Sequence, residues 1–547
     1  MFQTMSLTDV MEDVDYKRKN FNRDDVLFRH PLHMTEAHFV YHLSRDPEGH
    51  LTCKKDSNGE FICSPRRLKQ LCMHRLVINP ARMQKFKYHE LPHDIYPALL
   101  SEAIFQRELQ AITFFVSTWP HKMLDIQSIV PQEDILRSGY LTRPVEGQGS
   151  MSLVDSIIMG LLNIKAHAKV QTVNFIGFKN DRKLCRELAR LPILWLNPSD
   201  RQAGYIHSLL RRSINLSKDK VQRYLNRIGC IYSLLDPCFR HGNKIGPITI
   251  LIDCKITLDD VPIGLALQYE TPFRFACKRL WMEPILEVAL PPNVINRVLD
   301  PRHITHFELT DENLCSDLTK FDLVLEGLLL LPGLQALSLH NSLHTNLHVN
   351  AAYELNQTLQ QMNQLRKLNF SSCTLRNNLD SLLNNLTMPL IYLNLRDCRL
   401  TTMDMQFLYQ WQPVEGLQEL NLSRNNLKAV ALLTVGFLQK MPKITCFSVS
   451  YCCFSPIALK QVTRRSVDCS HLKIIGLQAF TPPPLPDLRE MLEDCANIPT
   501  LQRCSLLPEA YAFPGCNEAM RTANREGILN ICCQLLDEMG RTDIELE

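Results

Sequence analysis

Apolar residues recur through the second half of the chain in the order L-x-x-L-x-L. The order occurs in segments that begin at Ile304, Leu334, Leu365, Leu390, Leu417 and Ile444, with a weaker copy from Leu472. Side chains of a strand alternate between its two faces, so the two apolar residues of each L-x-L point to one side of a short strand. Between these segments, runs such as 379–386 and 432–441 have apolar residues every three or four positions, which predicts helices. The pattern therefore predicts a repeated unit of one strand and one helix.

The spacing and the turn residues of these segments indicate leucine-rich repeats. Successive segments begin 30, 31, 25, 27, 27 and 28 residues apart. Cys373, Cys398, Asn425 and Cys452 each stand three residues after the second strand apolar residue. An Asn amide can satisfy backbone groups of a turn there, and Cys is small enough to be buried. We predict an α/β leucine-rich repeat solenoid, a horseshoe whose strands line the concave side and whose helices line the convex side.

The flanking regions are less regular. Strand-like segments from Val170, Pro247 and Arg274 predict degenerate repeats that extend the solenoid over 131–300. The prolines at 482–484 predict the end of the regular stack, because proline continues neither a ladder nor a helix. The predicted organisation begins with a partly flexible N-terminal extension at 1–60, and a loop at 53–63 spans its end. A helical docking and cap region at 61–130 follows. Irregular repeats at 131–300, regular repeats at 301–482 and a helical C-terminal cap at 483–547 complete the chain.

Composition excludes several classes of function. The chain has 60 basic and 57 acidic residues, so its formal charge of +3 provides no chain-wide footprint for nucleic acid or an anionic membrane. The first thirty residues lack the apolar core of a signal peptide, and no segment has the roughly twenty apolar residues of a membrane helix. These observations predict a cytoplasmic protein that could also enter the nucleus, with neither nucleic acid nor membrane as its partner.

The cysteines and histidines do not form a recognisable reactive centre. We interpret the twenty cysteines as reduced thiols that pack mostly as small apolar residues. A zinc site formed by Cys53, Cys63, Cys72 and His74 is the alternative, although its spacing differs from that of zinc knuckles. Phosphate-binding, dinucleotide-binding, serine hydrolase and metalloprotease motifs are all missing from the sequence. The sequence therefore predicts a protein without enzymatic activity, cofactor or metal.

The concave face is the candidate surface for a substrate protein. Side chains predicted to point away from the core are the candidate contacts: Lys367, Asn369, Tyr392, Asn394, Arg396, Asp397, Glu419, Asn421, Arg424, Ser448 and Tyr451. Mixed charges, amides and tyrosines suit a protein or peptide. For any one residue, a solvated strand position is the alternative. L-x-x-L-L at 325–329 and 379–383 resembles a nuclear-receptor docking motif, but repeat helices produce the same spacing for packing.

A short apolar helix is predicted ahead of the repeats. Leu68, Cys72 and Leu76 recur at intervals of four and lie along one stripe of that helix. The arrangement resembles the BC-box, through which substrate receptors bind elongin C. In that mode the leucine enters an apolar pocket and the small cysteine permits close approach of the helices. Packing of a plain amphipathic helix on its own domain is the alternative.

A second segment with a related role follows. Leu91, Pro92, Ile95 and Leu99 match the spacing of a cullin-2 box, with proline at the first turn of a helix. The interval between the two segments, from Leu76 to Leu91, is longer than is usual for such a pair. The first helix of a solenoid cap is the alternative interpretation.

The region from Glu90 to Val130 resembles the N-terminal signature of the PRAME family. The matching residues are Tyr96-Pro97, Leu99, Phe105 and Trp119-Pro120, and the segments from Val170 and Arg274 resemble strands of that family. The resemblance spans roughly residues 60–547 and implies leucine-rich repeat receptors that bring substrates to cullin-2 ubiquitin ligases. The cysteine-rich tail of some relatives has no counterpart here.

Two hypotheses follow. The first is a non-catalytic substrate receptor in which residues 64–100 bind elongin B and elongin C together with cullin-2 and its RING subunit, while the solenoid presents a substrate protein. The alternative is a signalling or transcriptional adaptor that binds partners without ubiquitin transfer. A purely structural scaffold would bury Leu68 and Cys72 against the chain's own helices.

Overall fold

A parallel sheet of thirteen strands runs through the computed structural model of the chain. The structure describes residues 53–55, 61–63, 68–79, 91–130, 139–147, 151–178, 183–195, 246–256, 271–282, 301–310, 314, 318–343, 349–386, 388–480, 483–507 and 518–546. Within these ranges, each strand from β3 to β15 pairs in parallel with the next one along the chain. Such strict order requires a crossover between every two strands. The prediction of an α/β repeat architecture is therefore confirmed at this level.

Strands β4 to β13 occur where the apolar pattern predicts them, and the structure adds β3 before them and β14 and β15 after them. Their bounds are β3 Met123–Asp125, β4 Thr172–Phe175, β5 Ile248–Ile256, β6 Phe273–Met282, β7 His306–Leu309, β8 Ala336–Ser338, β9 Lys367–Asn369, β10 Tyr392–Asn394, β11 Glu419–Asn421, β12 Cys446–Ser448, β13 Ile474–Gly476, β14 Arg503–Ser505 and β15 Glu545–Leu546. The strands from the less regular region, β4 to β6, lie in the same sheet as those that follow.

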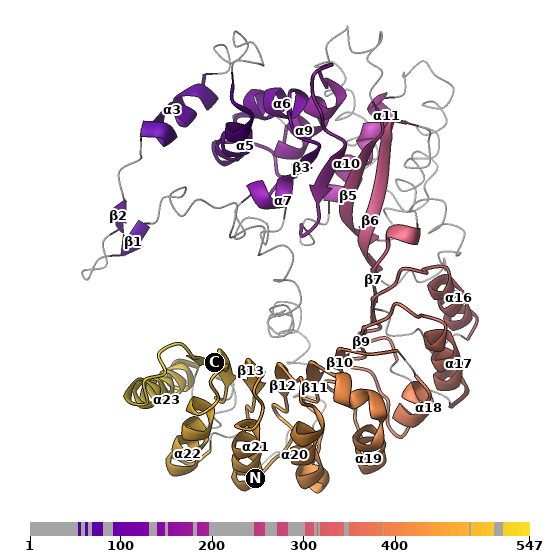
Figure 1. The fold of residues 1–547 in the computed structure, drawn as a ribbon, viewed down its shortest axis with the longest axis vertical. Coiled ribbons are helices and arrows are strands. Elements are labelled where there is room, and N and C mark those ends of the chain that lie inside the picture. Colours follow the sequence, from indigo (N-terminus) through magenta and orange to yellow (C-terminus); the bar gives the residue numbers. More distant parts are fainter. Residues whose placement is uncertain are drawn as a thin grey trace, which may run out of the picture.

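Helices pack along one side of this sheet (Figure 1). Those that follow the repeat strands are α16 Leu318–Leu329, α17 Val349–Gln360, α18 Leu379–Leu383, α19 Thr402–Gln410, α20 Ala431–Lys440, α21 Pro456–Ser466, α22 Leu485–Ala496 and α23 Glu518–Glu538. Short 3-10 helices η6 Pro301–His303, η8 Gln412–Gly416 and η9 Lys428–Val430 accompany them. The N-terminal helices are α3 Leu68–Val77, η2 His93–Ile95, α5 Tyr96–Phe105, α6 Leu109–Ser117, α7 Ile126–Ile129, α9 Leu153–Leu162, α10 Leu184–Leu188 and α11 Arg190–Trp195.

The core lies between the sheet and the helices, and the strand register lines it with apolar residues. Leu368 pairs with Leu393, Leu393 with Leu420, and Leu420 with Phe447, so the middle residue of each strand forms one continuous apolar row. All four side chains are fully buried. Helix residues such as Leu408 close the same core from the other side. The residues before and after this middle position point to the opposite face, which we call the open face of the sheet.

The turn after each strand explains why Cys and Asn can exchange there. The Cys373 thiol donates to the Leu339 carbonyl, the Cys398 thiol to the Phe370 carbonyl, and the Cys452 thiol to the Leu422 carbonyl. Asn425 donates its amide Nδ2 to the carbonyl of Leu395, which is the corresponding position of the preceding repeat. Burial raises the pKa of these thiols, that of Cys373 to about 11 and that of Cys452 to about 12. They are therefore structural donors in the protonated form.

Two predictions about local structure are wrong. The prolines near 483 do not end the stack, because β14 and β15 continue the sheet beyond them. Pro484 and Pro486 stand at the start of α22, where a missing N–H costs no helical hydrogen bond. The segment 53–63, predicted as a loop, contains the antiparallel strands β1 Cys53–Lys55 and β2 Phe61–Cys63. Asn58-Gly59 between them is a recognised hairpin signal.

No helix in the described part of the chain has both the length and the apolar character needed to cross a membrane.

Candidate functional site

Helix α3 is held on the N-terminal helices by one of its faces. Val77 is fully buried, and Met73 and Leu76 are half-buried against the chain's core. On the same helix, His74 Nδ1 lies 3.0 Å from Glu102 Oε1 of α5. These contacts fix which side of α3 faces inward.

The opposite side of α3 is open to solvent. Cys72 and Arg75 are exposed, and so is Ile78, which follows the helix. The side chain of Leu68 lies outside the residues whose side chains the structure describes. Of the three residues predicted to bind elongin C, Cys72 is thus accessible and Leu76 sits at the boundary with the core. The burial of Cys72 that a purely structural scaffold would require does not occur.

The predicted cullin-box residues divide between surface and core. Pro92 is exposed ahead of η2, while Leu91 and Ile95 are half-buried against the core. Leu99 is buried within α5, beside the layer in which Tyr96 packs edge-on against Phe115. Leu99 would have to leave the core to contact a partner directly. Its side chain therefore anchors the segment on the chain and is not part of an accessible surface.

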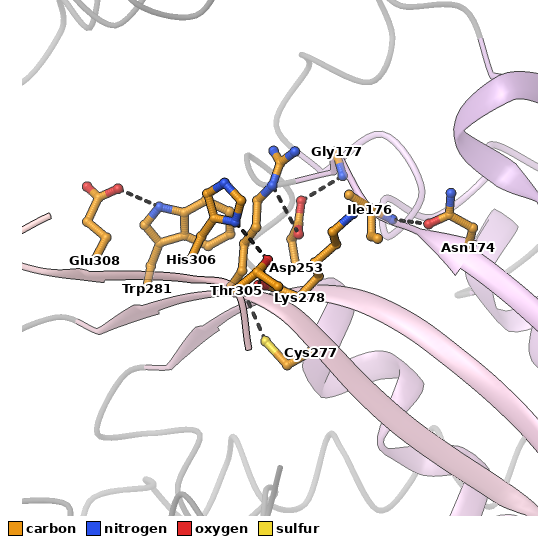
Figure 2. Close-up of polar contacts among 11 residues, drawn as sticks. Asn174, Ile176, Gly177, Asp253, Cys277, Lys278, Trp281, Thr305, His306 and Glu308 are labelled. Atoms are coloured by element: carbon orange, nitrogen blue, oxygen red, sulfur yellow. Dashed lines mark hydrogen bonds and ion pairs between the residues drawn. The ribbon is translucent and has the colours of Figure 1, made fainter. Parts of the chain in front are cut away.

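A polar and aromatic cluster occupies the open face over β5, β6 and β7. Figure 2 shows Trp281, His306 and Glu308 on one side of the strands, with the buried Cys277 on the other. Trp281 Nε1 donates to Glu308 Oε2 at 2.7 Å, across the pair that joins β6 to β7. Trp281, His306 and Glu308 are all half-buried.

The turn after β4 supports one edge of this cluster. Gly177 has a φ of +104°, which favours glycine, and its N–H donates to Asp253 Oδ2 at 2.7 Å. Asp253 also lies 3.9 Å from Arg279 Nε. Figure 2 shows Asn174, a residue of β4, with Ile176 and Gly177 of the turn that follows.

Sequence reasoning treated the segment from Arg274 only as a strand and did not identify this cluster. The signal was nevertheless in the sequence, because Arg279 and Trp281 flank the buried Leu280 and must point away from the core.

The predicted substrate contacts are less exposed than their alternation implies. Lys367, Asn369, Arg396, Asp397 and Arg424 are half-buried. The remainder are buried: Tyr392, Asn394, Glu419, Asn421, Ser448 and Tyr451. Neighbouring strands of a sheet lie only about 4.8 Å apart, so large polar side chains in register cover one another.

Three asparagines on this face complete strand ends. Asn369, Asn394 and Asn421 are in register, and each accepts a hydrogen bond from the backbone N–H two residues further on. An amide used in this way closes the turn after its strand. The Oδ1 atoms of these three asparagines are therefore engaged in holding the turns.

Glu419 is the most unusual polar group of the open face. It is fully buried, and neither carboxylate oxygen has a hydrogen-bond partner. In the strand register it stands between Tyr392 and Cys446. Burial raises the pKa of Glu419 to about 8, and the positive charge of Lys367 opposes this rise. Burial also lowers the pKa of Lys367. Glu419 is consequently poised to be a neutral carboxylic acid at neutral pH.

No group of three or more His, Cys, Asp or Glu residues that could hold a metal ion occurs among the described residues. Of the candidate zinc ligands, Cys53 and Cys63 lie opposite one another in the β1 and β2 pair.

Comparison with known proteins gives two findings. Residues 65–141 match the PRAME N-terminal domain. The chain is 24% identical to leucine-rich repeat-containing protein 14 of Xenopus laevis over 470 residues, which is 82% of this chain and 87% of the relative. It is 22% identical to the Mus musculus protein of that name over 74% of this chain and 79% of the relative. For the Homo sapiens protein of that name, the identity is 23% over 78% and 82% respectively.

Proposed function

We propose that this chain, a leucine-rich repeat relative of leucine-rich repeat-containing protein 14 with a PRAME N-terminal domain, is a non-catalytic substrate receptor of a cullin-2 ubiquitin ligase. In this proposal α3 binds elongin C, which brings elongin B. The segment around Pro92 then contacts cullin-2 with its RING subunit. The chain supplies binding and geometry, and the ligase performs the chemistry.

The observation that carries the proposal is the exposure of Cys72 on a helix that is otherwise anchored. Met73, Leu76 and Val77 hold α3 on the chain, so a partner helix would meet an ordered surface. Binding to an ordered surface costs less conformational entropy than binding to a disordered peptide. A small residue at the centre of that surface permits close approach of a second helix.

The remaining part of the proposal concerns the repeats. We infer a horseshoe closed by helical caps, whose open face or edge holds the substrate protein. The half-buried Trp281, His306 and Glu308 suit a polypeptide because aromatic and charged groups together are typical of protein interfaces. If the elongin interaction is absent, the alternative of an adaptor that binds proteins without ubiquitin transfer takes its place.

Binding to purified elongin B and elongin C tests the proposal directly. The full-length protein should bind the immobilised complex, and Cys72→Arg should weaken binding at least tenfold because a long charged side chain prevents close approach. Cys533→Arg is the matched control, since Cys533 is also an exposed cysteine on a helix. Absence of wild-type binding, or equal binding by Cys72→Arg, would overturn the proposal.

A second measurement addresses cullin-2. With elongin B and elongin C bound, wild-type protein should recruit purified cullin-2, and Pro92→Asp should lower that recruitment while it leaves elongin binding intact. Pro92 is exposed, so this change does not disturb the core. Unaltered recruitment by Pro92→Asp would exclude this segment from the cullin contact.

A further inference from the structure

Four large apolar side chains are exposed at the starts of four successive repeat helices. Met403 is the second residue of α19, Leu432 of α20 and Ile457 of α21, and Leu485 is the first residue of α22. Their exposed fractions are 66%, 75%, 68% and 53% respectively. We call these four residues the apolar ridge.

The fold places the ridge residues in one row. Strands β10 to β13 are parallel and each is followed by one of these helices, so the helices run in the same direction and their first turns lie at the same edge. Helices α19 to α22 pack side by side (Figure 1). Packed helices lie about 10 Å apart, so the row extends for about 30 Å.

Core packing does not account for the ridge. Other residues of the same helices fill the core, among them Met405, Leu408, Leu438 and Leu492, all of which are buried. A single exposed apolar residue needs no explanation, but four at the same turn of successive helices form a patch on the order of several hundred Å². Patches of that size on soluble proteins mark interaction surfaces.

Basic residues flank half of the ridge. Arg399 precedes Met403 by four residues, Lys428 precedes Leu432 by four residues, and both basic side chains are exposed. Of the acidic residues close in sequence, Asp404 is buried and accepts hydrogen bonds from the backbone N–H groups of Leu379 and Thr401. Asp397 is half-buried, and Asp487 beside Leu485 pairs with Lys460. The surface beside α19 and α20 is therefore both apolar and positively charged.

From this arrangement we propose that the ridge is a docking surface for an acidic amphipathic helix of a partner protein. Seven residues of an α-helix advance by about 10.5 Å, close to the separation of neighbouring ridge residues. A partner helix of about 22 residues can thus set one apolar residue against each ridge residue. Acidic residues beside that stripe pair with Arg399 and Lys428.

The charge complementarity distinguishes this occupant from others. A second copy whose ridge ran in the same direction would bring the like charges of Arg399 and Lys428 together, which is unfavourable in an interface. The proposal does not depend on α3. An experiment can therefore refute the receptor role and leave the ridge proposal standing, or the reverse.

Two fluorescent helical peptides of 22 residues test the proposal. Both carry Leu at heptad positions a and d. One has Glu at most other positions, and the other has Lys there. Fluorescence anisotropy with the full-length protein should show at least tenfold tighter binding of the acidic peptide. The double variant Leu432→Asp with Ile457→Asp should lose at least tenfold, whereas Leu329→Asp, at an exposed leucine of α16, should bind like wild type.

Charge reversal provides the second arm. Arg399→Glu with Lys428→Glu should reverse the preference toward the basic peptide, and Cys72→Arg should leave peptide binding unchanged. Equal binding of the two peptides, or full binding by the ridge double variant, overturns the proposal. A wild-type dimer in light scattering that Leu432→Asp dissociates would identify a second copy as the occupant and also overturn it.

Discussion

Asn425 offers a quantitative test of how the repeats are joined. Its Oδ1 accepts the backbone N–H groups of Cys398 at 3.0 Å and Leu400 at 3.1 Å. Its Nδ2 donates to the carbonyls of Leu395 and Leu422, each at 2.8 Å. The side chain is almost fully buried. One amide thus satisfies backbone groups of two neighbouring repeats.

Replacement by Ala and replacement by Cys should differ in cost. Asn425→Ala leaves two buried N–H groups without acceptors, and each such group costs about 1 to 3 kcal/mol. We expect a loss of about 3 to 5 kcal/mol in the free energy of unfolding. Asn425→Cys removes the same acceptor but should cost about 1 kcal/mol less than Asn425→Ala, because a thiol can donate to the Leu395 carbonyl in place of Nδ2. Other repeats already use this arrangement, with Cys452 donating to Leu422 and its backbone carbonyl accepting from Leu427 N–H.

Urea unfolding followed by circular dichroism measures the overall cost, and amide hydrogen exchange locates it. Protection of the Cys398 and Leu400 amides should fall in both variants, because both lose the Oδ1 acceptor, and it should fall further in Asn425→Ala, which also loses the donor to Leu395. If both variants lose the same stability, or if Asn425→Ala loses less than about 1 kcal/mol, then the bridging bonds do not carry the energy assigned to them.

Three further predictions concern buried groups. Because Glu419 has a pKa of about 8 in the fold against an ordinary 4.5, its contribution to stability is full below pH 4.5 and is lost as the pH rises through 8. The free energy of unfolding of Glu419→Gln should therefore exceed that of wild type by a margin that grows over this range, to about 5 kcal/mol, which thermal unfolding at several pH values measures; a constant margin would contradict the assignment. Gly160→Ala places a Cβ 2.6 Å from Val116 Cβ where α9 meets α6, and should lower the urea midpoint by an amount equivalent to about 1 to 3 kcal/mol. The fully buried Arg190 forms ion pairs with Asp155 and Glu187, so Arg190→Met should cost about 3 to 5 kcal/mol in thermal unfolding, with partial recovery on adding Glu187→Gln.

The apolar pattern was sufficient to predict the strands from β7 to β13, since each has its middle apolar residue in the core row. It was not applied to β14, although Leu501, Cys504 and Leu506 keep the same spacing. Cys504 takes the place of the middle leucine and is fully buried, so the L-x-L signature is incomplete in this repeat. β15 has two residues, Glu545–Leu546, and is too short to show any period.

Burial depth at the candidate sites did not follow from alternation. A period of two assigns Glu419 to the open face but cannot indicate that its neighbours in register, Tyr392 and Cys446, leave it enclosed. Similarly, the helical period places Ile95 and Leu99 on one face without showing that this face packs inward. Both features depend on contacts between segments distant in sequence. The apolar ridge did not follow from the pattern for a different reason, because a helical period alone does not show which apolar residues of a helix stay exposed.

The strict order of the sheet also determines a length. Twelve intervals separate β3 from β15, and at about 4.8 Å each the strands span about 58 Å when measured along the sheet. Helix α3 stands at one end of this row, whereas the ridge begins seven strands further on, at the helix that follows β10. Each additional repeat would move the proposed ridge partner away from the proposed α3 partner by one repeat, which is about 4.8 Å at the strands and about 10 Å at the helices. Under the two proposals, the number of repeats therefore sets the distance between the partner at α3 and the partner at the ridge, and adding or deleting one repeat would change that distance while both proposed surfaces keep their residues.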